Sequence, residues 1–210
     1  MKNVRPCLRF IYRACKRSLD YRRLQVQMIS PSLLDAEEYA ADQAHRHVKR
    51  PSHCPQCGAH KTCRALGFYS RSVTARMSGK VICIKVRRFL CEHCHRTISI
   101  LPSFAQPYRL ICSFTIERFF NGAVSVRDTL QWRGLLRRYW RRFTAWVPDL
   151  VSIVGRSIGL SLRNSLSEGS WHAIVQAFGH LDQATRKLVR YFQVTLFGRY
   201  RCHRPVAPDG

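Results

Sequence analysis

Two cysteine pairs with the same internal spacing constrain this chain more than any other feature of its sequence. Cys54 and Cys57 form one C-x-x-C turn, Cys91 and Cys94 form a second, and 33 residues separate the two pairs. Four cysteine thiolates complete the tetrahedral coordination of a structural zinc ion. We therefore predict a zinc site made by these four residues, which organises the fold and leaves no coordination position open for catalysis.

The segment between the pairs has the composition of β-strands. Aromatic and small apolar residues fill positions 65–71, and β-branched residues dominate positions 81–90, which run directly into Cys91. Residues 78–80, Ser-Gly-Lys, predict a turn before the second run. Two cysteine turns joined by a β-hairpin constitute a zinc ribbon, and a long hairpin loop is tolerated because loop-closure entropy grows slowly with length.

The other cysteines and the neighbouring histidines are weaker candidates for metal ligands. A complete set of four thiolates makes the histidines unnecessary, so we expect them beside the site or on the surface. Cys63 is a weaker fifth candidate, and Cys83 lies among valine and isoleucine, which predicts a core position. The remaining cysteines are expected to pack as small hydrophobic residues. These histidines and remaining cysteines are His53, His60, His93, His95, Cys7, Cys15, Cys112 and Cys202.

The charge balance indicates a polyanionic partner. Lysine and arginine number 36 against 12 acidic residues, which gives a formal net charge of +24. Such an excess repels itself unless a polyanion neutralises it, and the guanidinium group suits both phosphates and guanine edges. DNA, RNA and an anionic membrane are the candidates, and the arginine content favours nucleic acid as the partner.

Neither a signal peptide nor a membrane span is predicted. The N-terminal 27 residues are basic throughout, and the nearest approach to an apolar run, residues 147–162, is interrupted by Asp149 and Arg156. We therefore expect a cytoplasmic, nucleoid-associated protein with no membrane partner. Thiols stay reduced in the cytoplasm, so ten cysteines favour metal binding over disulfides.

Helical signals flank the cysteine region. Residues 30–48 predict a helix with Ser32 as its N-cap and acidic residues in its first turn. A capping box at residues 125–128 begins another helix, which Pro148 is expected to close. The further helices expected lie over residues 149–166, from residue 170, and over residues 182–197.

The helix before Pro148 carries charge on one side and apolar side chains on the other. Trp132, Leu136, Phe143 and Val147 belong to an apolar stripe with helical spacing. Five arginines occupy the opposite face, and no acidic residue pairs with them one turn away. We expect them to contact nucleic acid, mainly at phosphates, together with two arginines of the second strand. The predicted nucleic-acid-binding residues are Arg87, Arg88, Arg133, Arg137, Arg138, Arg141 and Arg142.

Three stretches around the cysteines follow one pattern: CPQCG, then RALGFYSR, then VRRFLCEHCHRTISILPSFAQPY. Over residues 51–110 this pattern resembles the zinc-ribbon region of bacterial insertion-sequence transposases and their accessory proteins. The resemblance implies DNA binding in a mobile element, with other transposition proteins as partners. It also implies a helix-turn-helix after the ribbon, in the place of VSVRDTLQWRGLLRRYWRRF. The matching positions include Arg87, Arg88, Cys91, Cys94, Arg96, Thr97, Ser99 and Pro102.

Transposases of this kind use three carboxylates to hold two metal ions for strand transfer. After the ribbon this chain has six acidic residues, none at the end of a convincing strand, and about 100 residues are few for a nuclease core. We therefore predict no catalytic residue. The alternatives are a small or truncated transposase, an RNA-binding ribbon protein that stacks bases on Phe68 and Tyr69, and a protein-interaction adaptor. The six acids are Glu117, Asp128, Asp149, Glu168, Asp182 and Asp209.

The expected fold class is α+β, with a small β-hairpin zinc ribbon followed by an all-helical C-terminal region. Residues 1–50 are expected to form a basic arm and a short helix, and residues 51–112 the zinc ribbon. Residues 113–198 would form the helical DNA-binding domain, and residues 199–210 a tail. The composition changes sharply at Met28, which is therefore an alternative to Met1 as the start.

Overall fold

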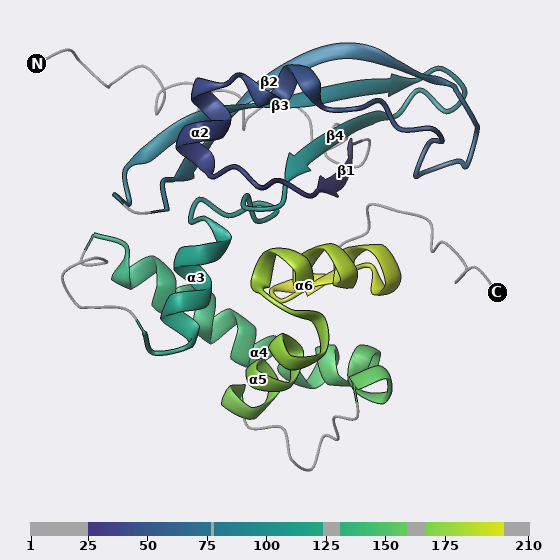
Figure 1. Cartoon of the computed structure of the whole chain (residues 1–210). Coiled ribbons are helices and arrows are strands. Elements are labelled where there is room, and N and C mark those ends of the chain that lie inside the picture. Colours follow the sequence, from purple (N-terminus) through teal and green to yellow (C-terminus); the bar gives the residue numbers. More distant parts are fainter. Residues whose placement is uncertain (1–24, 77, 124–130, 159–166, 200–210) are drawn as a thin grey trace, which may run out of the picture.

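A four-stranded sheet and a group of helices make up the two halves of the protein (Figure 1). The structure is a computed structural model that describes residues 25–76, 78–123, 131–158 and 167–199. The cysteine pairs lie in the sheet half, and the helical half follows it in sequence. The α+β class expected from the sequence is confirmed.

The centre of the sheet half is the antiparallel hairpin of β2 (Cys63–Thr74) and β3 (Val81–Cys91). Its register pairs Cys63 with Cys91 at one end and Thr74 with Val81 at the other. Gly79 adopts a positive φ of 62° in the turn between the strands, a conformation that glycine reaches without steric cost. Both predicted strands are confirmed, and each is longer than its sequence pattern indicated.

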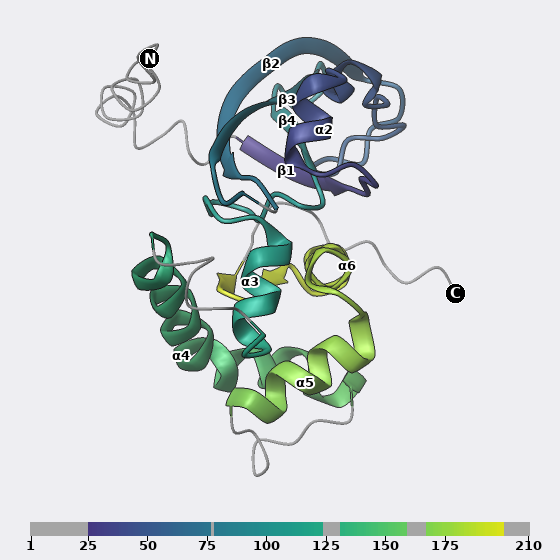
Figure 2. The ribbon, with the colours of Figure 1, turned by 60° about the vertical axis from the view of Figure 1, so that its left-hand side comes forward.

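Two further strands complete the sheet in the order β1-β4-β3-β2 (Figure 2). Strand β4 (Thr97–Pro102) runs antiparallel to β3, and β1 (Gln25–Ser30) runs parallel to β4. The predicted end of the basic arm, near residue 27, therefore falls inside a strand. Pairing of β1 with β4 joins residues more than 70 positions apart, so no local sequence pattern predicts it.

Helix α2 (Ala36–Ala41) follows β1 and is capped by Asp35, whose carboxylate accepts hydrogen bonds from the backbone amides of Glu37 and Glu38. The Glu38 side chain accepts in return from the Asp35 backbone amide at 2.9 Å, which completes a capping box. The prediction of Ser32 as N-cap is wrong, because Asp35 has the glutamate at the required spacing. The predicted helix over 30–48 is reduced to α2 and a 3₁₀ turn, η2 (Ala44–His47).

The helical half contains α3 (Ser113–Phe120), α4 (Arg133–Ile158), α5 (Ser167–Phe178) and α6 (Leu181–Lys187). A π-helical turn, η4 (Leu188–Phe192), extends α6, and Gln193 then adopts a left-handed conformation that ends it. Two short paired strands follow, β5 (Val194–Thr195) and β6 (Gly198–Arg199). The helix expected over 182–197 is therefore confirmed only in its first part.

Helix α4 continues through Pro148, so the prediction that this proline separates two helices is wrong. Proline removes the hydrogen bond that its amide would donate to the carbonyl of Thr144. Thr144 and Pro148 both lie on the exposed side of α4, where solvent can satisfy the carbonyl that proline leaves without a donor. The apolar stripe meanwhile continues past the proline to Leu150, Val151 and Val154. The capping box expected at 125–128 lies outside the described residues.

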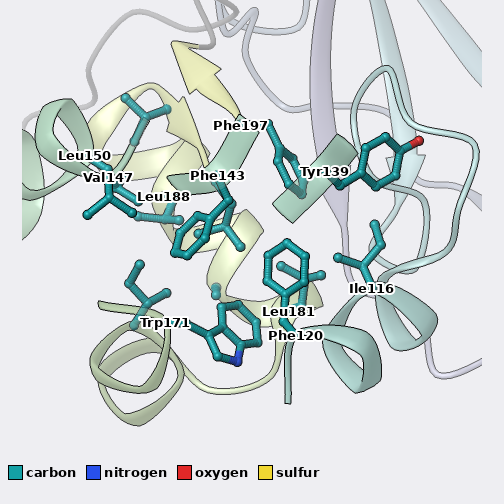
Figure 3. Close-up of a cluster of buried hydrophobic side chains, with 14 of the residues drawn as sticks. Ile116, Phe120, Tyr139, Phe143, Val147, Leu150, Trp171, Leu181, Leu188 and Phe197 are labelled. Carbon is teal, nitrogen blue, oxygen red and sulfur yellow. The ribbon is translucent and has the colours of Figure 1, made fainter. Parts of the chain in front are cut away.

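Aromatic rings from three helices form the core of the helical half (Figure 3). Phe120 lies edge-on to Trp171, with ring centroids 5.2 Å apart, and 5.5 Å from the Phe143 ring. Trp171 and Phe143 are fully buried. The Trp171 indole nitrogen donates to Asn121 Oδ1 at 2.6 Å, so its one polar group is satisfied.

Buried polar contacts join the two halves at the segment between β4 and α3. Gln106, which is 1% exposed, places its Nε2 2.9 Å from both Ser113 Oγ and Thr185 Oγ1. Val189 of η4 packs in the cluster that contains Phe89 and the metal-site cysteines. The sheet and the helices are therefore held by one continuous set of contacts. No helix among the described ranges has the length and apolarity needed to cross a bilayer.

Glu117 supplies a contact whose removal is measurable. Its carboxylate accepts from the backbone amide of Leu181 at 2.8 Å, at the start of α6, and from His180 Nδ1 at 2.7 Å. Glu117→Ala should lower the free energy of unfolding by about 1 kcal/mol, the usual value of a helix cap. The exposed Asp149→Ala serves as control, and chemical denaturation measures both.

The same variant should show a pH dependence. The hydrogen bond and the charge of Glu117 raise the pKa of His180. The stabilisation from this pair is complete below the ordinary histidine pKa of about 6.5 and is lost as pH rises through the raised pKa of His180. Glu117→Ala should therefore cost more at about pH 6 than at about pH 8. An equal cost at both values would show that the His180 contact contributes nothing.

Candidate metal centre and basic surface

The four cysteines predicted as ligands converge at one end of the sheet. Cys54 and Cys57 lie in the turn that precedes β2, Cys91 is the last residue of β3, and Cys94 follows in the turn to β4. Their four sulfur atoms all lie within 4.8 Å of one another. Cys54 and Cys91 are buried, and Cys57 and Cys94 are half-buried. The expected convergence of the two pairs is confirmed.

The spacing of the sulfurs fits a tetrahedral metal ion. Cys54 Sγ lies 3.7 Å from Cys94 Sγ, and Cys57 Sγ lies 3.7 Å from Cys91 Sγ. A tetrahedron with metal–sulfur bonds of about 2.3 Å places neighbouring sulfurs about 3.8 Å apart. A disulfide would require about 2.0 Å. The two separations are therefore compatible with four ligands around one ion and not with disulfides.

Backbone hydrogen bonds fix the two cysteine turns. In the first turn the amide of Gly58 donates to the carbonyl of Cys54 at 2.8 Å, and Gly58 has a positive φ of 77°. In the second, the amide of Cys91 donates to the carbonyl of Arg96 at 3.0 Å, and His95 adopts a positive φ of 54°. Each turn thereby directs two thiols toward the same point.

The protonation of the thiols shows what the cluster requires. Burial raises the pKa of Cys94 to about 12, and the neighbouring thiols of Cys91, Cys57 and Cys54 add to the increase. Burial also opposes ionisation of Cys91, but hydrogen bonds from Thr62 and from two backbone amides outweigh it and lower its pKa to about 6. Four crowded thiolates repel each other, and a divalent cation removes that repulsion. The geometry therefore assembles ligands that a cation would hold in the ionised state.

Residues near the cluster do not join it. Cys63 pairs with Cys91 across the hairpin, but its sulfur is not among the four that converge, and burial raises its pKa to about 11. His53 and His60 form an isolated β-bridge beside the first turn. All four flanking histidines are exposed, as expected. Cys112 is buried, as expected of a small hydrophobic residue, whereas Cys7, Cys15 and Cys202 lie outside the described residues.

The prediction that Cys83 lies in the core is wrong, because its side chain is exposed. Strand β3 alternates in this stretch, with Ile84 and Val86 buried and Cys83 and Lys85 exposed. The β-branched composition correctly indicated a strand but did not show which side faces the core.

The arginines of α4 lie on its exposed side. Arg133, Arg137, Arg138, Arg141 and Arg142 are all exposed, whereas Leu136, Tyr139, Phe143 and Val147 are buried. The prediction that α4 carries its arginines and its apolar side chains on opposite sides is therefore confirmed. Arg142 differs from the others in one respect, because its Nε donates to the carbonyl of Phe197 at 2.9 Å.

The two predicted arginines of β3 are less accessible. Arg87 and Arg88 are both half-buried, and the Nε atom of each is buried with no hydrogen-bond partner. The Arg87 guanidinium lies 5.7 Å from the centre of the Phe89 ring, and that of Arg88 lies 6.0 Å from the Tyr69 ring. Their contact with a ligand stays a prediction.

The acidic residues considered for strand transfer do not come together among the described residues. The cysteine cluster is the one group of three or more metal-ligating side chains found in that part of the chain. Glu117 caps α6, Asp149 and Glu168 are exposed, and Asp182 lies in the first turn of α6. Asp128 and Asp209 lie outside the described residues.

This region of the chain is similar to one known protein family. Residues 54–139 match a domain of unknown function, DUF6431, and this span holds both cysteine pairs, β2 to β4, α3 and the start of α4. No curated protein and no solved structure matches the chain.

The cysteine cluster should bind a single divalent ion per chain, and each thiolate should be required. Cys91→Ser should weaken metal affinity by at least about 100-fold, because one of the four ligands is lost. It should also lower the melting temperature, because the ion would no longer tie the end of β3 to the start of β2. Cys83→Ser, in the same strand and exposed, is the matched control. Elemental analysis after dialysis and circular dichroism measure the two effects. Undiminished metal content in Cys91→Ser would contradict the ligand assignment.

Proposed function

We propose that this protein is a zinc-dependent DNA-binding protein of a bacterial mobile element, in which a four-cysteine zinc site holds the sheet and α4 presents arginines to the duplex. The proposal rests on the exposed arginine face of α4, together with the four-cysteine cluster of the sheet half. It includes the cytoplasmic, nucleoid-associated location that such a partner implies.

The ligand chemistry favours zinc. Four thiolates in a tetrahedral arrangement suit zinc or iron, and calcium and magnesium prefer oxygen ligands. A closed four-sulfur site has no coordination position for water or substrate, so its metal stabilises the fold. Within this chain the ion would tie the start of β2 to the junction of β3 and β4.

The arginine face of α4 has the dimensions and charge of a DNA-contacting surface. Arg133, Arg137 and Arg141 form a row about 12 Å long, comparable with the width of the major groove. The two ion pairs found in the described residues, Arg64 with Glu92 and His180 with Glu117, include none of these arginines. Together with the net charge of +24, this leaves cations that DNA phosphates would neutralise.

The mobile-element part of the proposal is supported by the sequence resemblance described above. Arg87, Arg88, Arg96, Thr97 and Ser99 occupy the pattern around the second cysteine pair. Transposition proteins of the same element would then be partners, as would the inverted repeats at its ends.

One observation favours single-stranded RNA as the alternative ligand. Phe68 is 45% exposed on β2, and the Lys85 ammonium lies 4.8 Å from its ring centre. An exposed ring beside a cation is the arrangement on which unpaired bases stack. Competition between a duplex DNA and an unstructured RNA of equal length separates the two ligands.

The salt dependence of DNA binding tests the role of α4. The affinity of the full, metal-loaded chain for a short random-sequence duplex should fall steeply between about 50 and 200 mM salt. Arg137→Gln and Arg141→Gln should each reduce the slope of log affinity against log salt by about one. Arg156→Gln, an exposed arginine near the end of the same helix, should leave the slope unchanged. A flat salt response of the unsubstituted chain would contradict DNA binding.

A further inference from the structure

Three arginines from separate parts of the chain meet where the sheet half joins the helical half. Arg71 belongs to β2, Arg109 to the segment between β4 and α3, and Arg142 to α4. Arg71 and Arg109 are half-buried, and Arg142 is exposed, so solvent reaches the cluster. Arg109 has no signal in the sequence, because it lies in an irregular segment without a charge pattern.

Each guanidinium is held in place by neutral groups. Arg71 donates to the carbonyls of Gln106 and Arg109, the latter at 3.0 Å. Arg142 Nε donates to the carbonyl of Phe197 at 2.9 Å. These hydrogen bonds use only some of the five donor hydrogens of each guanidinium.

Arg109 is positioned by two aromatic rings and by a hydrogen bond from its Nη1 to the carbonyl of Tyr108 at 3.2 Å. Its guanidinium carbon lies 5.4 Å from the centre of the Tyr139 ring and 5.0 Å from that of Phe197. The carbonyl of Phe197 receives Arg142, so Arg109 and Arg142 approach Phe197 together. Arg109 Nε is buried without a hydrogen-bond partner, and such a donor is costly unless a ligand satisfies it.

Within the described ranges, none of the three arginines forms an ion pair with an acidic residue. Burial lowers the pKa of Arg109, and repulsion from Arg142 and Arg71 lowers it further. Like charges that the fold holds together in this way attract an anion with several acceptor oxygens.

We infer that Arg71, Arg109 and Arg142 form a binding site for a tetrahedral oxyanion, a phosphate group of the nucleic-acid backbone. A phosphate offers oxygens in several directions, which three guanidiniums from different elements can share, whereas a carboxylate offers one plane. The nucleic-acid source rests on the proposed function, because Arg142 lies beside Arg141 and one turn from Arg138 on the exposed side of α4. The site would then bring the sheet and α4 into contact with the same nucleic-acid strand.

Two titrations of the full, metal-loaded chain test this site. Isothermal titration with inorganic phosphate measures the oxyanion site alone, and the salt slope of duplex binding measures the backbone contact. Arg109→Gln should weaken phosphate binding by about tenfold or more and reduce the salt slope by about one. Arg142→Gln should act in the same direction while leaving the ring contacts of Arg109 in place. Thermal unfolding verifies that both variants fold.

Arg156→Gln is the matched control, because it removes the same charge from roughly the same side of α4, about 21 Å farther along the helix. It should alter neither titration. Folded Arg109→Gln and Arg142→Gln variants that keep the phosphate affinity and salt slope of the unsubstituted chain would overturn the site. If phosphate binding depends on Arg109 but no duplex binds, the three arginines form a site for free phosphate and the proposed function is contradicted. If a duplex binds with an unchanged slope in both variants, the proposed function stands and this site fails.

Discussion

The convergence of four cysteine sulfurs is the constraint on which the rest of the structure depends. Cys54 and Cys57 precede the hairpin, Cys91 ends it and Cys94 follows it, so a shared ion would close the long hairpin at its open end. The second pair also sets the point where β3 turns into β4, and β4 in turn receives β1. Burial and the neighbouring thiols oppose ionisation of Cys94, whereas a divalent cation at the same place would stabilise its thiolate. Metal binding and sheet formation are therefore expected to be a single event.

The metal centre is connected to the helical half by packing as well as by sequence. Val189 of η4 packs in the same cluster as Phe89 and the cysteines, and Gln106 bridges Ser113 and Thr185 at the junction. These contacts give the arginine face of α4 a fixed position relative to the sheet. A charged helix in isolation would present arginines without a defined orientation. Anchored in this way, α4 and the junction arginines can act on one nucleic-acid ligand as a unit.

Local patterns in the sequence were sufficient for the features that depend on neighbouring residues. The cysteine spacing indicated the metal cluster, the β-branched run indicated β3, and helical spacing separated the arginines of α4 from its apolar stripe. The errors concern choices that tertiary structure decides. Pro148 was expected to end a helix, but its position on the exposed side of α4 lets the helix continue. The pairing of β1 with β4, and the meeting of Arg109 with Arg142, join distant segments and have no local signal. Asp35 could have been identified as the N-cap, because Glu38 stands at the capping-box spacing.

X-ray absorption at the zinc edge of the purified full chain tests the central claim most directly. If the four cysteines hold zinc, the first coordination shell should contain four sulfur atoms at about 2.3 Å and no lighter ligand. A shell that includes nitrogen or oxygen, or a protein that carries no zinc after expression with the metal supplied, would contradict the account.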